Sequence, residues 1–194
     1  MTGMNTAGRV RIIGGAWRRR TLRFPADCGL RPTPDRVRET LFNWLGQELD
    51  GLSCLDLFAG SGALGIEAAS RGAGRVTLVE RSAPVFKALK ANIAHLQATQ
   101  IQGAKIEVCR ADARDFIQQS LNRTGPAYDL LFLDPPFGQG WLPFLASLLS
   151  ALLKPDGRLY VESETPVSSL GDWRTIKSGH TRQVNYHLLQ CSKA

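Results

Sequence analysis

Hydrophobic and polar positions follow two alternating patterns between residues 53 and 163. Short apolar runs, typical of strands buried on both faces, are followed by stretches in which apolar residues recur every three or four positions. The apolar runs predict strands over 53–58, 75–80, 105–111, 128–134 and 157–163. The other stretches predict helices over 63–72, 82–97, 113–121 and 141–153. Repeated strand–helix–strand units predict an α/β fold, in which helices cover both faces of a mostly parallel sheet.

The two ends of the chain follow other patterns. Residues 9–13 and 20–24 read as short strands around Gly14–Gly15 and predict a small β-hairpin arm, before a helix over 35–48. Two further strands are expected near 173–178 and 182–190, joined by a turn at Ser178–Gly179. Because no helix separates these last strands, they predict an antiparallel edge and seven strands in the main sheet.

Composition limits the class of protein. The 194 residues are 43% hydrophobic and 21% charged, which is usual for one globular domain. The chain has no apolar run long enough to span a membrane, and its first residues lack the apolar core of a secretory signal. The four cysteines are scattered and form no C-x-x-C pair, so we expect neither a zinc site nor a disulfide framework. A reducing cytoplasm is the expected location.

The formal net charge of +7 is concentrated at the N-terminus. Residues 1–38 contain nine arginines and two aspartates, whereas the rest of the chain carries equal numbers of basic and acidic side chains. Arginine binds phosphate in a bidentate manner and stacks on bases, so this segment is a candidate contact for nucleic acid. A solvated hairpin or a disordered basic tail would have the same composition.

A glycine-rich loop follows the first predicted strand of the sheet. Gly60, Gly62 and Gly65 form the pattern G-x-G-x-x-G between a strand and a helix, and Glu80 ends the next strand. Such a loop approaches a ligand closely, and the acid can accept hydrogen bonds from ribose hydroxyl groups. The pattern therefore predicts a nucleoside-bearing cofactor, with Ser61 contacting either the cofactor or its own turn.

Two further acids bear on which cofactor is bound. Asp56 ends the first strand, where it would repel the pyrophosphate of a dinucleotide but attract the ammonium group of S-adenosylmethionine. Asp112 follows the third strand and can accept a hydrogen bond from an adenine amino group. These acids favour S-adenosylmethionine over NAD, although each of them taken alone could simply cap a helix.

The sequence Asp134-Pro135-Pro136-Phe137 follows the fourth strand of the sheet. Two prolines stiffen the loop, so the Asp134 carboxylate and the Pro135 carbonyl can both accept hydrogen bonds from one planar amino group. Phe137 can stack on the ring that carries this group. Such acceptors would stabilise the positive charge that develops when the amino nitrogen attacks a methyl donor. The alternative is a rigid turn without a chemical role.

Several stretches of the chain resemble the RsmD family, bacterial enzymes that methylate N2 of one guanine in 16S ribosomal RNA. They are RIIGGAWRRRTL (11–22), LRPTPDRVRETLFNWL (30–45), LDLFAGSGALGIEAASRGA (55–73), LDPPF (133–137) and YVESE (160–164). The resemblance implies a Rossmann-like class I methyltransferase fold over 35–194. It also implies a basic arm over 9–34 and a disordered segment over 1–8.

The resemblance also implies roles for individual residues. Four are expected to hold the guanine: Asp134, Pro135, Pro136 and Phe137. Eight are expected to contact the cofactor: Asp56, Gly60, Ser61, Gly62, Glu80, Arg81, Asp112 and Ala113. Seven are expected to face RNA: Arg11, Trp17, Arg18, Arg19, Arg20, Arg31 and Thr33. Glu162 and Glu164 end the fifth strand, where a structural role and a substrate role are equally compatible with the sequence.

The partner implied by the resemblance is 16S rRNA, within an assembled small ribosomal subunit and bound by a monomer. Three alternatives to this function stay open at the level of sequence. An adenine-N6 or protein-glutamine methyltransferase would carry the same proline corner. A nicotinamide-dependent oxidoreductase would share the glycine loop, and a non-catalytic RNA-binding assembly factor would share the fold.

Overall fold

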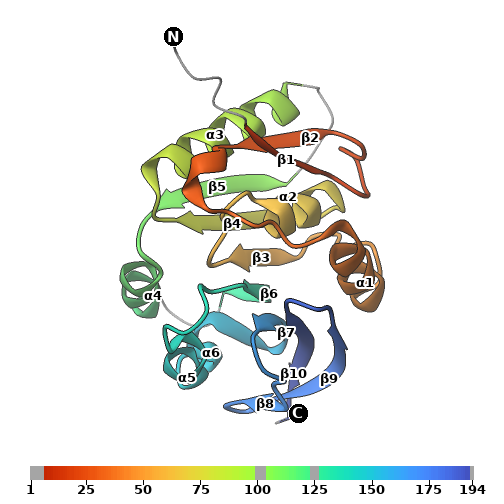
Figure 1. Cartoon of the computed structure of the whole chain (residues 1–194). Helices are drawn as coiled ribbons and strands as arrows, with labels where there is room; N and C mark the ends of the chain where they lie inside the picture. The colour runs from red at the N-terminus through yellow and green to blue at the C-terminus, as the bar shows by residue number, and fades with distance from the viewer. Residues whose placement is uncertain (1–6, 99–103, 123–126, 193–194) are drawn as a thin grey trace.

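The computed structural model describes residues 7–98, 104–122 and 127–192. An eight-stranded sheet runs through its centre (Figure 1). In spatial order its strands are β5 (Lys105–Arg110), β4 (Arg75–Glu80), β3 (Ser53–Asp56), β6 (Tyr128–Leu133), β7 (Leu153–Ser163), β10 (Asn185–Cys191), β9 (Trp173–His180) and β8 (Ser169–Leu170). The first five strands are parallel, and the remaining neighbours pair antiparallel. The expected parallel sheet with an antiparallel edge is therefore confirmed, with the two-residue β8 as an additional edge strand.

Alternate residues of the central strands pack into two separate apolar clusters, as strands buried on both faces require. On one face, Phe132 and Tyr160 pack with α1 (Asp35–Leu45), α2 (Ala63–Ser70) and α3 (Ala83–Gln97). On the other face, the strand residues pack against α4 (Ala113–Leu121), α5 (Trp141–Ala146) and α6 (Leu149–Leu152). The described part of the chain contains no helix long and apolar enough to cross a membrane.

The region predicted as one helix over 141–153 forms two short helices instead, α5 and α6. The turn between them allows Leu145, Leu149 and Leu152 all to be buried against the sheet. β7 then begins at Leu153, four residues earlier than the predicted 157. The prediction was wrong here because the apolar residues of this region reach the core from two separate short helices.

The predicted turn at Ser178–Gly179 was also wrong, since both residues lie within β9. The connection to β10 comes later, where the Thr181 hydroxyl accepts hydrogen bonds from the backbone N–H groups of Gln183 and Val184. Gly179 pairs with Tyr186 across the strands, and a Cβ atom there would lie 2.4 Å from the Tyr186 ring. Glycine is needed at this position for close packing, not for a turn.

The N-terminal arm is a hairpin of β1 (Gly8–Arg11) and β2 (Thr21–Phe24) that packs onto the sheet's helices. Residues 1–8 were expected to be disordered, but Gly8 belongs to β1 and pairs with Phe24. Residues 1–6 lie outside the described ranges. The inward side chains of the arm belong to the same buried cluster as α1 and α2. They are Val10, Ile12, Trp17, Leu22 and Phe24. The arm is therefore part of the core on one side and exposed on the other.

A buried carboxylate joins the arm to two helices. Glu67 of α2 is fully buried and accepts hydrogen bonds from the backbone N–H groups of Ile13 (2.8 Å) and Gly14 (2.7 Å). It also pairs with Arg71 at 2.8 Å and with the buried Arg38 of α1 at 3.3 Å. Because charged and backbone donors surround it, the charge of Glu67 is compensated at the point where arm, α1 and α2 meet.

We predict that Glu67→Ala lowers the free energy of unfolding by about 3 kcal/mol or more, because Arg38 and two backbone donors lose their buried acceptor. Urea denaturation followed by circular dichroism measures this change. Glu107→Ala is the matched control, since Glu107 pairs with Arg75 at 3.0 Å on the exposed surface. The control should change stability by less than about 1 kcal/mol. Equal losses in the two variants would contradict the role given to Glu67.

Candidate active site

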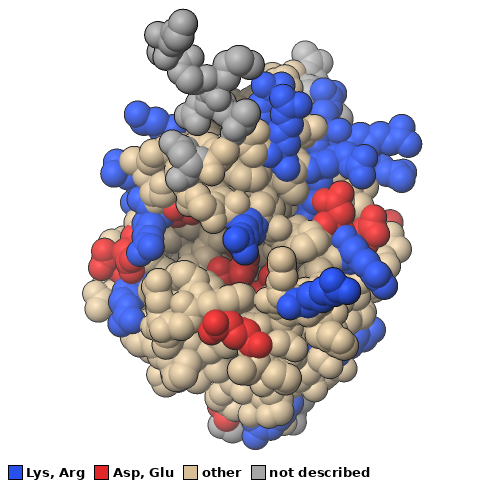
Figure 2. Space-filling view, in the orientation of Figure 1, with Lys and Arg blue, Asp and Glu red and all other residues tan. Residues whose placement is uncertain are grey.

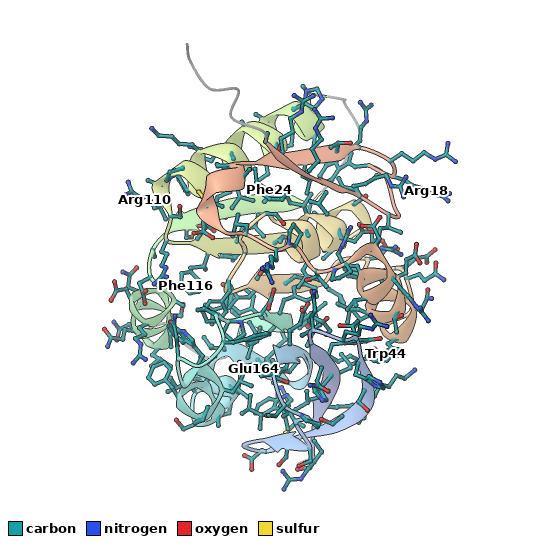
Figure 3. All side chains as sticks on the ribbon, viewed as in Figure 1. Arg18, Phe24, Trp44, Arg110, Phe116 and Glu164 are labelled. Atoms are coloured by element: carbon teal, nitrogen blue, oxygen red, sulfur yellow. The ribbon has the colours of Figure 1, made fainter. Side chains whose placement is uncertain are left out.

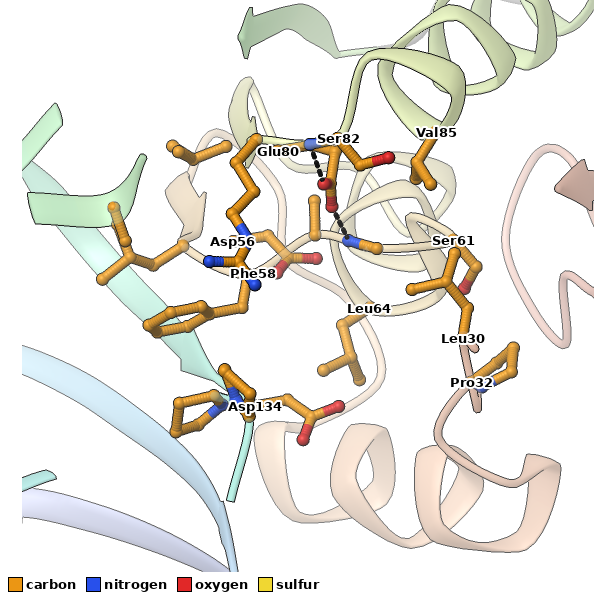
Figure 4. Close-up of a pocket in the computed structure, with 18 of the residues that line it drawn as sticks. Leu30, Pro32, Asp56, Phe58, Ser61, Leu64, Glu80, Ser82, Val85 and Asp134 are labelled. Carbon is orange, nitrogen blue, oxygen red and sulfur yellow. Dashed lines mark hydrogen bonds between the residues drawn. The ribbon is translucent and has the colours of Figure 1, made fainter. Parts of the chain in front are cut away.

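A cavity of about 530 Å³ opens at the carboxyl edge of the parallel strands (Figure 4). The loops that follow β3, β4, β5 and β6 all end there, as does the loop between η1 (Ala26–Cys28) and α1. The cavity lies where the strand order changes direction, between β3 and β6, which is the usual ligand position in open α/β sheets. Residues from both halves of the sheet can therefore contact one ligand.

Most of the residues predicted from sequence for the cofactor and the guanine line this cavity. They are Asp56, Gly60, Ser61, Glu80, Arg81, Asp112, Ala113, Asp134, Pro135, Pro136 and Phe137. Arg31 and Thr33, predicted to face RNA, line it as well. The fold thus brings together segments that are up to about a hundred residues apart in the chain.

The glycine loop turns sharply into α2. Gly62 has φ +78°, a left-handed conformation that disfavours a side chain, and it shapes the loop without lining the cavity. Gly65 lets α2 approach β4 closely, since a Cβ atom there would lie 2.3 Å from Leu78 Cδ2. The predicted contact between Gly62 and the cofactor stays a prediction; the structure shows that this residue sets the path of the backbone beside the cavity.

Glu80 holds two backbone segments at the cavity. Its carboxylate accepts hydrogen bonds from the N–H groups of Gly60 at 3.0 Å and Ser82 at 2.6 Å (Figure 4). These bonds fix the glycine loop against the start of α3. Each carboxylate oxygen can accept more than one hydrogen bond, so Glu80 can also bind ligand hydroxyl groups.

Asp56 is 2% exposed and accepts a hydrogen bond from the Gly65 N–H group at 3.0 Å. Burial raises the pKa of Asp56 to about 7, and hydrogen bonds from the backbone of Gly65 and Phe58 oppose this effect only in part. Asp112 accepts a hydrogen bond from the Arg114 N–H group at 2.9 Å and caps α4. Both acids therefore contact helix N-termini and also line the cavity, so capping and ligand binding are compatible.

The proline corner faces the glycine loop across the cavity. The Asp134 carboxylate points into the cavity (Figure 4). Pro135 is buried, and Phe137, which also lines the cavity, is 42% exposed. Burial raises the pKa of Asp134 well above its usual value, and the negative charges of Glu162 and Asp56 raise it further. Asp134 is therefore a stronger proton acceptor than a carboxylate in water.

Aromatic residues that the sequence analysis did not select close one end of the cavity. Phe58 and Trp141 both line it, and their rings meet edge to face with centroids 4.9 Å apart. The Arg114 guanidinium group lies 4.9 Å from the centroid of the Trp141 ring. Phe58 ends the strand predicted over 53–58, and Trp141 begins the helix predicted after the proline corner. Both positions could have drawn attention, because they fall at the carboxyl edge of the sheet.

The predicted RNA contacts divide into exposed and buried residues. Arg18, Arg19 and Arg20 are exposed at the tip of the hairpin, and Figure 3 shows Arg18 extending outward. Arg11 is also exposed on its side chain (64%) and lies 3.5 Å from Asp35. Lysine and arginine side chains gather over the hairpin, above the hollow in the middle of the same face (Figure 2).

Trp17 was predicted to face RNA, and this prediction was wrong. Its side chain is 1% exposed and belongs to the core beneath the hairpin. Its backbone N–H donates to the Ser70 hydroxyl at 2.9 Å, which fixes the turn on α2. Thr33 is 5% exposed and faces the cavity rather than the open surface.

No group of three or more histidine, cysteine, aspartate or glutamate residues within the described ranges could hold a metal ion.

Comparison with known proteins agrees with this geometry. The model of the family described as "Conserved hypothetical protein 95" matches residues 10–190. The chain is 43% identical to "Ribosomal RNA small subunit methyltransferase D" of Haemophilus influenzae, over 96% of each chain. It is 41% identical to the protein of the same name in Escherichia coli K12, over 95% of this chain and 91% of that protein. The chain belongs to this family.

Solved structures of similar proteins confirm the fold. The YhhF protein of Escherichia coli is 42% identical, with a TM-score of 0.80, and the match covers 95% of this chain and 98% of that chain. A protein of Haemophilus influenzae is 40% identical, with a TM-score of 0.76 and coverage of 95% and 99%. The expected RsmD-family membership and class I methyltransferase fold are both confirmed.

The raised pKa of Asp56 predicts a pH-dependent effect on stability. The folded protein keeps the Asp56 proton up to about pH 7, whereas the unfolded chain loses it near 3.8, so this group lowers stability as the pH rises between these values. Asp56→Asn should therefore raise the free energy of unfolding by about 2 to 4 kcal/mol at pH 8 and by much less at pH 4.

Urea denaturation at the two pH values tests this effect. Asp156→Asn, at an exposed position of β7, is the matched control and should change stability by less than about 0.5 kcal/mol. A gain for Asp56→Asn that does not depend on pH would contradict the burial effect.

Proposed function

We propose that the protein transfers the methyl group of S-adenosylmethionine to the exocyclic N2 atom of a guanine in 16S rRNA. The observation that carries this proposal is that the Asp134–Phe137 corner and the glycine loop with Glu80 line one cavity. Membership of the family, together with the names of its curated relatives, makes the chain a methyltransferase of small-subunit rRNA. The choice of guanine N2 rests on the resemblance and on the chemistry of the corner.

The residues of the cavity fit S-adenosylmethionine. Asp56, in its ionised form, would hold the ammonium group, and Glu80 would accept hydrogen bonds from the ribose hydroxyl groups. Asp112 and Ala113, at the start of α4, would contact the adenine beside the Phe58 ring. When bound, this cofactor supplies a methyl group on a positively charged sulfur.

The proline corner would prepare the amino group for attack. The Asp134 carboxylate and the Pro135 carbonyl would accept its two N–H hydrogens, which fixes its plane and stabilises the developing positive charge. Phe137, exposed at the rim, would stack on the base. Because one cavity would hold both reacting groups, the amino nitrogen would lie next to the methyl carbon in a fixed orientation. Asp134 would then take the proton that the nitrogen loses.

We also propose that the protein acts as a monomer in the cytoplasm, on an assembled small ribosomal subunit. The exposed side of the arm supplies the basic surface for the phosphate backbone, with Arg11, Arg18, Arg19 and Arg20 on the hairpin and Arg31 at the cavity rim. A surface of this size favours recognition of RNA shape, and the target base must be unstacked to enter the cavity.

We predict that Asp134→Ala reduces methyl transfer by at least about a hundredfold, because both an acceptor and a base are lost. Binding of S-adenosylhomocysteine, measured by calorimetry, should stay within about threefold of wild type, since Asp134 lies on the guanine side. The assay uses labelled S-adenosylmethionine and small subunits from a strain that lacks the enzyme, and nucleoside analysis should yield N2-methylguanosine. N6-methyladenosine would reject the guanine assignment, and full activity of the variant would indicate that the corner is only a turn.

We predict that replacing Arg18, Arg19 and Arg20 together by alanine weakens RNA binding and makes its salt dependence shallower. Each lost phosphate contact lowers the slope of log K against log salt by about 0.7. Fluorescence anisotropy with a 16S rRNA fragment at several salt concentrations measures both effects. Exposed Arg158, Lys177 and Arg182 in the C-terminal part carry the same charge and provide the control triple variant. Equal effects of the two triple variants would mean that only net charge matters.

A further inference from the structure

Glu162 is a buried carboxylate next to the catalytic corner that the mechanism above does not use. Strands β6 and β7 are parallel, and Leu133 pairs with Val161, so Asp134 and Glu162 occupy the next positions on neighbouring strands. Phe132 and Tyr160, two residues earlier, are also partners, and their rings meet on the α1 face of the sheet. Since side chains alternate along a strand, Asp134 and Glu162 project toward this same face.

The position of Glu162 is fixed by two hydroxyl groups. The Thr33 hydroxyl donates to Glu162 Oε1 at 2.7 Å, and the Tyr160 hydroxyl donates to the same oxygen at 3.0 Å. Thr33 is itself held, because its carbonyl accepts a hydrogen bond from the buried Arg38 at 3.1 Å. Glu162 is 4% exposed, so its carboxylate is held in one position.

The ionisable side chains next to this pair are acidic. Three acidic side chains lie close enough to act on Asp134: Glu162 and the neutral Tyr160 from β7, and Asp56 from β3. Arg31 lines the same cavity from its exposed rim. Within the described ranges, no lysine or arginine forms an ion pair with Asp134 or Glu162. Burial raises the pKa of Glu162, and the hydrogen bonds from Thr33 and Tyr160 oppose that rise. Two neighbouring carboxyl groups placed this way, one buried and one half-buried, destabilise a fold, and such pairs are typical of functional sites.

We infer that Glu162 is a positioning residue for methyl transfer, whose carboxylate, held by Thr33 and Tyr160, makes the neighbouring Asp134 an effective acceptor for the proton of the amino group. This inference rests on the proposed function. In the reaction, the bond between sulfur and the methyl carbon breaks, and its electron pair stays on sulfur, which becomes neutral. The amino nitrogen forms the new bond to carbon with its lone pair and becomes positively charged.

The proton then moves from this nitrogen to the Asp134 carboxylate. Asp134 becomes neutral, and the charge on nitrogen is removed, so atoms and charges balance without a further reactant. The fixed negative charge of Glu162 favours this transfer, because protonation of Asp134 removes the repulsion between two buried carboxylates. Glu162 does not line the cavity and acts through Asp134 without touching the substrate.

The test uses Glu162→Gln, which keeps an oxygen for Thr33 and Tyr160 and removes the charge. Single-turnover methyl transfer to small subunits, with saturating S-adenosylmethionine, is measured between about pH 5.5 and about pH 9. The plateau rate should fall at least about tenfold, and the acidic limb of the profile should move to lower pH, because Asp134 loses its negative neighbour. The affinity for S-adenosylhomocysteine should stay within about twofold of wild type.

Two further variants separate this role from a structural one. Thr33→Val removes one donor to Glu162 and should move the acidic limb in the same direction by a smaller amount. Glu164→Gln, the same substitution at an exposed position two residues further on, should leave rate and profile unchanged.

A Glu162→Gln profile whose acidic limb coincides with that of wild type would overturn the inference, whatever happens to the rate. The proposed function fails separately, if the wild-type protein itself transfers no methyl group to the particle.

Discussion

The direct pairing of β3 with β6 is the constraint on which the site depends. Strands β4 and β5 extend the sheet on one side of this pair, and β7 and β10 extend it on the other. The loops after β3 and β6 therefore leave the sheet in opposite directions and leave a crevice between them. Asp56 pairs with Phe132, two residues before Asp134, so the acids proposed to contact the cofactor and the guanine come from neighbouring strands. No flexible domain closure is needed to bring the two halves together.

Buried carboxylates have two different environments in this molecule. Glu67 is surrounded by Arg38, Arg71 and backbone donors, and its charge strengthens the contact between the arm and the helices. Asp134 and Glu162 lie at the carboxyl ends of β6 and β7. Two hydroxyl groups donate to Glu162, and no cation is paired with either acid within the described ranges. Residues of one chemical type therefore stabilise the fold at one place and reduce its stability at another, where the proposed reaction would need a proton acceptor.

The sequence predicted those parts of the fold and site that depend on local pattern. The parallel strands, the glycine loop and the proline corner each lie within a short segment, and placing these at one sheet edge required only the rule for parallel strands. Trp17 was misjudged because its arginine neighbours are exposed, while burial of its ring depends on α2, more than fifty residues away. The bond between Thr33 and Glu162 joins positions 129 residues apart, and no periodicity in a single sequence reports such a contact.

In the proposed function, the arm would connect RNA binding with the chemistry of the cavity. Its outer side carries the arginines, its inner side is part of the core, and the loop that follows it supplies Arg31 and Thr33 to the cavity. Since Arg38 holds both the Arg11 and the Thr33 carbonyl groups, the hairpin and this loop form one rigid surface. RNA held on the outer side would therefore have a fixed position relative to Asp134. A small enzyme can in this way select its base by the shape of the bound RNA, because the distance from the phosphate contacts to the proline corner is set by the fold.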